Sequence, residues 1–214
     1  EGRGERIEER PIGGNPFAGL WKVLSTPYLG GIAVFIFLMS GVNTVLYIQQ
    51  AGLLEINFPD GDARTGFLGR IELVMSITTL VLQLVAVGHL TRRAGVARMI
   101  VVVPLFVVPG FLLIAASPTL MTLVGVFVAR RVGQYAIVRP CREMLYTTVD
   151  RESKYKAKNV NDTLVYRTSD FVFAKAQDAI QASLTGAALF GAGIAAAWAA
   201  VAWFLGRAHE RTAR

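Results

Sequence analysis

The amino-acid sequence predicts an all-α membrane protein with six transmembrane helices, and three observations lead to this expectation. Hydrophobic residues make up 53% of the chain and the mean hydropathy is +0.47, which is more apolar than a soluble domain normally is. The apolar residues gather in segments long enough to cross a bilayer. The 22 Lys and Arg residues flank these segments, as the positive-inside rule describes, so the basic excess does not indicate nucleic-acid binding.

Residues 1–26 are expected to form a cytoplasmic linker and an interfacial helix. Residues 1–14 are charged and then rich in Gly, as flexible linkers are. A helix start at Asn15-Pro16 precedes apolar residues at i, i+3, i+4 and i+7, namely Phe17, Leu20, Trp21 and Leu24. This spacing suits an amphipathic helix on the membrane surface, with an ordinary linker helix as the alternative. Because the chain begins at Glu1 without a signal peptide, we expect it to be a piece of a longer membrane protein.

The first two predicted membrane helices, residues 28–50 and 67–88, each carry a polar stripe. On the first helix, at about 100° per residue, the stripe comprises Ser40, Asn43, Thr44 and Tyr47. On the second helix it comprises Glu72, Ser76, Thr79 and Gln83. Polar groups on a membrane helix face protein or water rather than lipid. The acidic loop between the two helices, residues 51–66, is expected outside the cell.

The third and fourth predicted helices differ sharply in polarity. The third, residues 98–116, follows a basic cytoplasmic loop at residues 88–98, is nearly all apolar, and is expected to be structural. The fourth, residues 119–140, brings four side chains into a sector of about 80°, namely Arg131, Tyr135, Arg139 and Arg142. Arg131 lies near the middle of the span and is expected to face a cavity, whereas Arg142 is assigned to the cytoplasmic headgroup zone. Arg130 is expected to pair with an acid on a neighbouring helix.

A basic cytoplasmic loop and two further helices complete the predicted bundle of residues 27–206. In the loop, residues 146–160, a run of alternating lysines is typical of a segment that faces lipid headgroups. The fifth helix, residues 161–182, has a polar stripe and is expected in the interior, with Arg167 and Asp170 paired three residues apart. The sixth, residues 184–205, is rich in Gly and Ala and is expected to pack closely. Residues 207–214 are expected to form a cytoplasmic tail.

Polar stripes on four of the six helices predict a water-filled cavity, as a transporter or channel requires. The sequence offers no nucleophile–base arrangement, metal-ligand spacing or phosphate-cradling Gly loop, so we expect neither an enzyme nor a bound metal or cofactor. The lone Cys141 excludes an internal disulfide. We therefore expect a multi-pass protein of the bacterial inner membrane with both termini in the cytoplasm.

The segment at residues 139–170 resembles the characteristic stretch of the ATP:ADP (nucleotide) antiporter family and its bacterial relatives, which share the major facilitator fold. The matching residues are Arg142-Glu143-Met144, Asp150-x-Glu152-x-Lys154, Lys156-x-Lys158 and Asp162. The loop sequence GHLTRRAG is similar to the loop signature of the major facilitator superfamily, with Arg92 where that signature has an acid. The resemblance implies the C-terminal six-helix half of a twelve-helix nucleotide exchanger, which works with an N-terminal half.

The resemblance implies that phosphates are bound by cationic residues, namely Lys154, Lys156, Lys158 and Arg167. Asp170 stands where we align a lysine in the exchangers, and an acid there weakens a polyphosphate site. With the stripe residues added, the predicted substrate-binding set is Arg131, Tyr135, Arg139, Arg167, Lys154, Lys156 and Lys158. The predicted coupling or gating set is Glu72, Asp170, Asp178, Gln83 and Asn43. Two alternatives stay open: a proton-coupled carrier of another solute, and a sensor or scaffold that transports nothing.

Overall fold

The computed structural model describes residues 16–84, 95–180 and 183–212, and these residues are almost entirely helical. In chain order the α-helices are α1 (Pro16–Ser25), α2 (Pro27–Asn57), α3 (Gly61–Leu82), α5 (Val96–Ala116), α6 (Leu120–Gly133), α7 (Arg139–Leu145), α8 (Arg151–Val160), α9 (Tyr166–Ile180) and α10 (Leu184–Thr212). A π-helical segment, Gln134–Val138, joins α6 to α7, and a second, Asn161–Val165, joins α8 to α9. A 3-10 turn, Tyr146–Thr148, follows α7.

Five helical stretches in the described part of the chain are long and apolar enough to cross a membrane, as an all-α membrane protein requires. They are Pro27–Asn57, Gly61–Leu82, Val96–Ala116, Leu120–Thr148 and Leu184–Arg211. The sixth expected span, residues 161–182, is helical as far as Ile180 but is not among these five. Its charged residues, which include Arg167, Asp170 and Lys175, lower its hydropathy.

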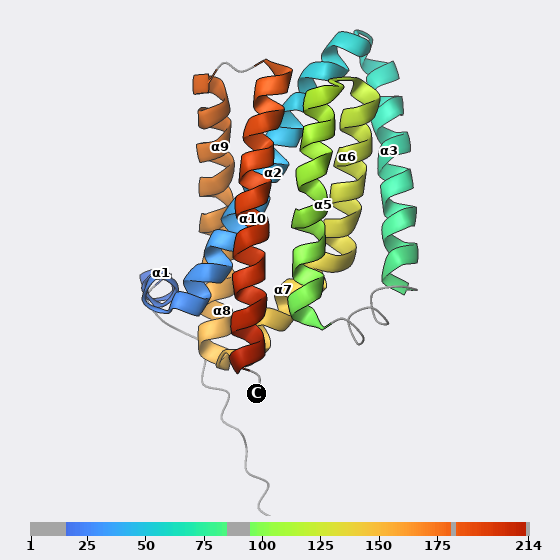
Figure 1. Cartoon of the computed structure of the whole chain (residues 1–214). Coiled ribbons are helices and arrows are strands. Elements are labelled where there is room, and N and C mark those ends of the chain that lie inside the picture. The colour runs from blue at the N-terminus through green and yellow to red at the C-terminus, as the bar shows by residue number, and fades with distance from the viewer. Residues whose placement is uncertain (1–15, 85–94, 181–182, 213–214) are drawn as a thin grey trace, which may run out of the picture.

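The long helices lie side by side, with α9 at one edge of the bundle and α3 at the other (Figure 1). Helix α10 packs along α5 and α2, α9 packs on α2, and α3 packs on α6. The short helix α1 lies beside α8 and α2, near the end of the bundle that carries the C-terminus (Figure 1). This arrangement leaves the outer sides of α3 and α9 uncovered by any described segment.

The apolar core lies between α2, α5 and α10. Trp198 of α10 is completely buried, and its ring centroid lies 5.7 Å from that of Phe35 on α2. Close approach of α10 to α5 depends on Gly191, because a Cβ at that position would overlap the ring of Phe111. The Gly- and Ala-rich sequence of α10 therefore packs closely, as expected.

The loop expected at residues 51–66 is wrong in extent. Helix α2 continues to Asn57 and α3 begins at Gly61, so only residues 58–60 connect them. Asp60 caps α3, since its Oδ2 accepts a hydrogen bond from the N–H of Ala63 at 2.9 Å. Arg64 donates from Nε and Nη2 to the carbonyl oxygen of Phe58 at 3.2 and 3.0 Å, which closes the turn. Because of these local hydrogen bonds, most of the polar segment that predicted a loop is helical.

The loop expected at residues 146–160 is also wrong, because most of it is helix α8. Asp150 is the N-cap and accepts from the N–H of Ser153 at 2.9 Å. Lys156 pairs with Glu152 one turn earlier at 2.6 Å. Helix α8 packs against α1, the short helix that the sequence predicted near residues 16–24. The basic residues thus lie on an ordered helix at one end of the bundle.

Two further expectations concern the ends of helices. The basic loop at residues 88–98 lies mostly outside the described residues, and α5 begins at Val96. The fourth predicted helix, residues 119–140, continues through α7 and its 3-10 turn to Thr148. Helix α10 runs to Thr212, so helix extends into the tail expected at residues 207–214.

Helix α9 is not interior, contrary to the expectation from its polar stripe. It lies at an edge of the bundle, where only Ser169 and Phe173 of this helix are buried. Ser169 donates to the carbonyl oxygen of Phe37 at 2.6 Å, and a Cβ at Gly41 would overlap the ring of Phe173. Asp170 of α9 also contacts α2, whereas Arg167, Lys175 and Asp178 are exposed within the described chain.

Candidate functional site

Polar side chains of α2, α6, α7 and α9 line two adjoining pockets. The first, the Arg130 pocket, has a volume of about 300 Å³ and is lined by Asn43, Arg130, Arg131, Gln134, Tyr135 and Tyr166, among others. The second, the Arg142 pocket, has a volume of about 350 Å³ and is lined by Gln134, Tyr135, Arg139, Arg142, Asp162 and Tyr166, among others. Because they share three lining residues, the pockets form one polar region with two compartments.

Arg130 is the most deeply buried charged side chain of this region, with an exposed fraction of 1%. Its Nη1 donates to Oε1 of Gln134 at 2.6 Å, and its Nη2 donates to Oδ1 of Asn43 at 2.7 Å. Within the described residues no acid pairs with Arg130, so the expected pairing is wrong. Amide oxygens bind its two Nη atoms instead, and its buried Nε has no hydrogen-bond partner there. A buried cation bound only to neutral acceptors keeps its charge uncompensated, which makes its surroundings attractive to an anion.

Arg131 faces the polar region, as the sequence predicts, and the structure brings it to Glu72. Its Nη1 lies 3.1 Å from Oε2 of Glu72, which joins α6 to α3. The guanidinium carbon also lies 5.8 Å from the ring centroid of Phe127 and 5.9 Å from that of Tyr135. The side chain of Arg131 is 31% exposed and that of Glu72 is 57% exposed, so the described chain covers this ion pair only in part.

Gln83, Tyr135 and Asn43 also lie at the polar region. Gln83 donates from Nε2 to the carbonyl oxygen of Tyr135 at 3.1 Å, which ties the end of α3 to the π-helical segment. Gln134, one of the shared lining residues, donates from Nε2 to the hydroxyl of Tyr166 at 3.4 Å. The stripes of α2, α3 and the fourth predicted helix therefore meet as expected.

Asp170 does not pair with Arg167, contrary to expectation. Its Oδ1 accepts hydrogen bonds from the hydroxyls of Ser40 at 2.6 Å and Thr44 at 2.8 Å, both on α2. Arg167 is exposed, and among the described residues it makes no salt bridge. Asp170 points toward the hydroxyls of α2, and this contact replaces the pair that spacing alone suggested.

The Arg142 pocket contains an ion-pair network that the sequence did not predict. Arg142 is only 11% exposed at its side chain, and its Nη1 lies 3.2 Å from Oδ1 of Asp162. Its Nη2 lies 3.8 Å from Oε1 of Glu143, which also binds Nζ of Lys158 through Oε2 at 2.9 Å. The network holds Arg142 on a pocket wall between α7 and the segment before α9, and its assignment to the headgroup zone stays a prediction.

The three lysines of α8 and Asp178 do not line either pocket. Lys156 and Lys158 pair with Glu152 and Glu143, as described above, and Lys154 makes no salt bridge within the described residues. Asp178 pairs with Lys175 at 3.7 Å, and both side chains are about 70% exposed. The structure thus separates these residues and Arg167 from the other predicted site residues.

Both π-helical segments border the pockets. The first, Gln134–Val138, contributes Gln134 and Tyr135, and the second, Asn161–Val165, contributes Asp162. An inserted π turn changes the direction in which the following side chains point, and such turns are frequent at functional sites. Arg142 and Tyr166, which follow these segments in the chain, both line the Arg142 pocket. Gln134 could have been found, because it lies one turn after Arg130 and can bind it.

Comparisons with protein-family models, with curated proteins and with solved structures find no match to this chain.

Proposed function

We propose that this chain forms part of the solute pathway of a secondary membrane carrier for an anionic solute. The charge of the two pockets supports this most directly. Arg131 pairs with Glu72 and Arg142 pairs with Asp162, so these charges offset one another. Arg130 and Arg139 also line the pockets, and within the described residues neither has a carboxylate partner. These two guanidinium groups leave the region positive, which favours an anion.

The chemistry of the walls suits a solute that carries phosphate or carboxylate beside a ring. Guanidinium groups bind both anions through paired hydrogen bonds. The rings of Tyr135 and Tyr166 border both pockets and offer apolar faces. Because residues 139–170 resemble the nucleotide antiporters, adenine nucleotides are the first solutes to test.

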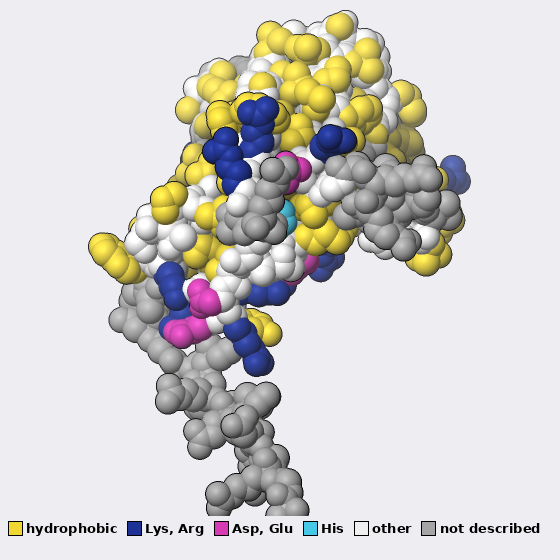
Figure 2. Space-filling model, turned by 60° about the horizontal axis from the view of Figure 1, so that its bottom comes forward, with side chains coloured by type: hydrophobic (Ala, Val, Ile, Leu, Met, Phe, Trp, Pro, Cys, Tyr) yellow, Lys and Arg dark blue, Asp and Glu magenta, His cyan; other side chains and the backbone are white. Residues whose placement is uncertain are grey.

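The proposed carrier places α9 in the membrane as a sixth span. Its charged residues would then face a second six-helix unit across the polar region, as the implied N-terminal half would provide. Lys and Arg side chains gather at the end of the bundle that carries α8 and the C-terminus, with hydrophobic side chains beyond them (Figure 2). By the positive-inside rule this end is cytoplasmic, which would put the C-terminus inside.

A proton-coupled carrier is the second candidate, and Asp170 favours it. Its carboxylate accepts two hydroxyl hydrogen bonds from α2 and no salt bridge within the described residues. A carboxyl group held in this way can take up a proton without breaking an ion pair. If Asp170 carries the coupling proton, Asp170→Asn would abolish uptake driven by a pH gradient. Exchange of solute without a pH gradient would remain.

The test is uptake of labelled ATP and ADP by liposomes that contain the full-length carrier, with and without nucleotide inside. We expect internal nucleotide to stimulate uptake, and we expect Arg139→Gln to reduce it by about tenfold or more, because an arginine that binds an anion directly contributes about 1.5–3 kcal/mol. Arg70→Gln is the matched control, since Arg70 on α3 is exposed and lines neither pocket.

Three results would separate the candidates. Equal loss in both variants would show that the pockets do not bind the solute. Absence of nucleotide uptake by correctly inserted protein would exclude nucleotides and direct the search to other anions. Absence of any flux of organic anions, with or without a pH gradient, would favour a scaffold whose ion pairs are structural.

A further inference from the structure

A third pocket lies on a different part of the molecule, between the first turn of α5 and the last turns of α10. Its volume is about 380 Å³, and it is lined by Ala97, Arg98, Val101, Trp203, Arg207 and Glu210. It shares no residue with the Arg130 or Arg142 pocket. We call it the Trp203 pocket.

A close backbone contact sets the shape of the Trp203 pocket. A Cβ at Gly206 would lie 2.8 Å from both Cα and the carbonyl oxygen of Ala97, so α10 touches α5 at this point. The long side chains of the neighbouring turns cannot enter this contact. They stand beside it and form the walls of the hollow.

The walls combine two cations with an indole ring and one acid. The guanidinium carbon of Arg207 lies 3.8 Å from the centroid of Trp203, a cation–π contact that fixes its position. Arg98 is exposed, and neither arginine makes a salt bridge within the described residues, although Glu210 lines the same pocket. The pocket therefore has a surplus positive charge, together with one carboxylate that can accept a hydrogen bond.

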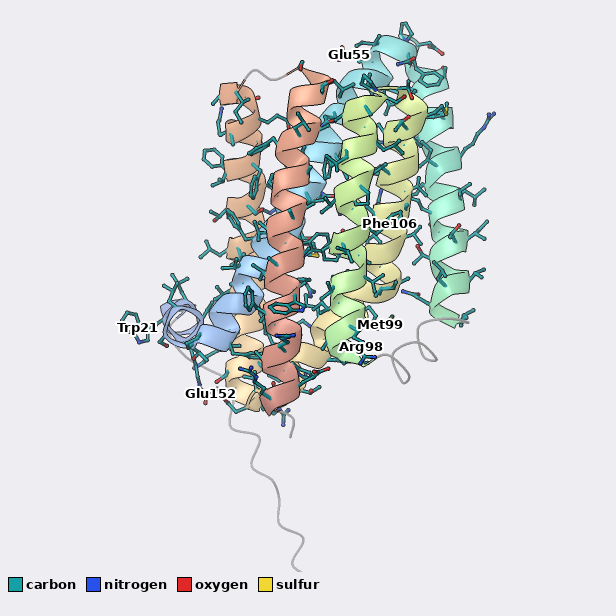
Figure 3. All side chains as sticks on the ribbon, viewed as in Figure 1. Trp21, Glu55, Arg98, Met99, Phe106 and Glu152 are labelled. Carbon is teal, nitrogen blue, oxygen red and sulfur yellow. The ribbon has the colours of Figure 1, made fainter. Side chains whose placement is uncertain are left out.

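The position of the pocket along the bundle matches the lipid headgroup layer. Exposed apolar side chains cover the next turns of α5, among them Val102, Leu105 and Phe106, and Phe204 does so on α10. Arg98 lies at the end of α5, at the same end of the bundle as the exposed Trp21 of α1, whereas Phe106 lies further along (Figure 3). Trp and Arg at the limit of an apolar surface are typical of the membrane–water interface.

The first turn of α5 adds a second source of positive charge. Gly95, at the N-cap, has no side chain that could cap the helix. Ala97 and Arg98 belong to this turn, whose N–H groups and helix dipole favour an anion.

We propose that the Trp203 pocket binds the headgroup of an anionic phospholipid with free headgroup hydroxyls, such as phosphatidylglycerol. Arg98 and Arg207 bind the phosphate, Glu210 accepts a hydrogen bond from a glycerol hydroxyl, and the acyl chains lie along the apolar surface of α5 and α10. Basic pockets between membrane helices on the cytoplasmic side are suited to such headgroups. The site is separate from the solute pathway, so it holds whether or not the carrier proposal does.

The test is retention of lipid by the full-length protein in native mass spectrometry, with phosphatidylglycerol and phosphatidylcholine offered at equal concentration. We expect phosphatidylglycerol to be retained preferentially, and we expect Arg98→Gln and Arg207→Gln each to weaken its binding about fivefold. Arg211→Gln is the matched control, because it removes an exposed cation from the same end of α10 but not from the pocket. Glu210→Gln should reduce the preference for phosphatidylglycerol over phosphatidic acid, which lacks the hydroxyls.

A fluorescence measurement tests the proposal even if one of the arginine variants fails to fold. The fluorescence of Trp203 is the part of the tryptophan emission that is absent in Trp203→Phe. Phosphatidylglycerol with brominated acyl chains should quench this fluorescence more strongly than brominated phosphatidylcholine does. Equal retention of the two lipids would overturn the proposal. So would an Arg211→Gln variant that binds phosphatidylglycerol as weakly as Arg98→Gln and Arg207→Gln do. Displacement of the lipid by soluble glycerol phosphate at similar concentration would also overturn it, since the site would then bind a free anion.

Discussion

The contact between α5 and α10 and the polar region between α2, α6 and α9 join helices by opposite means. At the first, glycines remove side chains, so that Gly191 meets Phe111 and Gly206 meets Ala97. At the second, a hydrogen bond crosses between helices, since Arg130 reaches Asn43. At the two glycines α10 touches α5 directly, whereas the hydrogen-bonded side chains border pockets of about 300 and 350 Å³. We therefore expect the first contact to be the rigid part of the molecule, and we propose that the second acts on a solute.

The largest effect is expected where packing is tightest. Gly191→Val should lower the free energy of unfolding by about 3 kcal/mol, because its side chain would overlap the ring of Phe111. Gly193→Val is the control, since a Cβ at Gly193 meets nothing within 4 Å. The measurement is thermal or denaturant unfolding of the purified protein in micelles. Equal losses in the two variants would show that the α5–α10 contact is not the rigid part of the fold.

In the polar region a single hydrogen bond should matter less. Asn43→Leu should cost about 2 kcal/mol, because it leaves Nη2 of the buried Arg130 without its acceptor. Arg130→Met in the same background should recover part of the loss, since the unpaired charge is then absent. Asn57→Leu is the control, because Asn57 is exposed on the same helix and binds only the carbonyl oxygen of Leu53. No difference between the two asparagine variants would contradict the account of Arg130.

The Arg131–Glu72 pair should contribute little to stability. Both side chains are partly exposed, so a double-mutant cycle with Arg131→Met and Glu72→Gln should give a coupling of about 0.5 kcal/mol. A coupling well above this would indicate a sealed, structural ion pair. That result would favour the scaffold over the carrier.

The smallest effect is expected at α8, outside both regions. The hydrogen bond from Ser153 holds the pKa of Asp150 below its ordinary value of 3.8, with Lys22 as a lesser cause. A lowered carboxyl pKa stabilises the fold above the ordinary value, and this contribution is lost as pH falls through the lowered pKa. Hydrogen exchange of α8, corrected for the intrinsic rate, should therefore accelerate below about pH 4. Asp150→Asn should show no such pH dependence, whereas an unchanged pH dependence would exclude Asp150 as its cause.

Hydropathy predicted the membrane helices well, but local hydrogen bonds decided where they begin and end. Residues 51–66 and 146–160 read as loops because they are polar. Asp60 and Asp150 act there as N-caps, and each starts a helix within the expected loop. A cap is a single contact whose formation depends on backbone geometry, so composition alone does not reveal it.

The candidate site was predicted in part. The helical period grouped Arg131, Tyr135, Arg139 and Arg142 on one face, and all four line the two pockets, as does Asn43 of the first stripe. The period does not reveal the ion pair between Arg142 and Asp162, because Asp162 comes from a separate segment of the chain. Arg130 and Arg131 are adjacent, and which one is buried depends on how α6 is turned toward α2, which the sequence does not specify.

The most direct test of the central claim is the charge preference of a cysteine placed in the polar region. Tyr135→Cys lies at both pockets, and the native Cys141 is buried, so the introduced thiol should react alone. We expect a negatively charged methanethiosulfonate to react about tenfold faster than a positively charged one of similar size. We also expect Arg130→Gln with Arg139→Gln to remove this preference. An unreactive thiol, or a faster reaction with the positive reagent, would contradict an anion-attracting cavity.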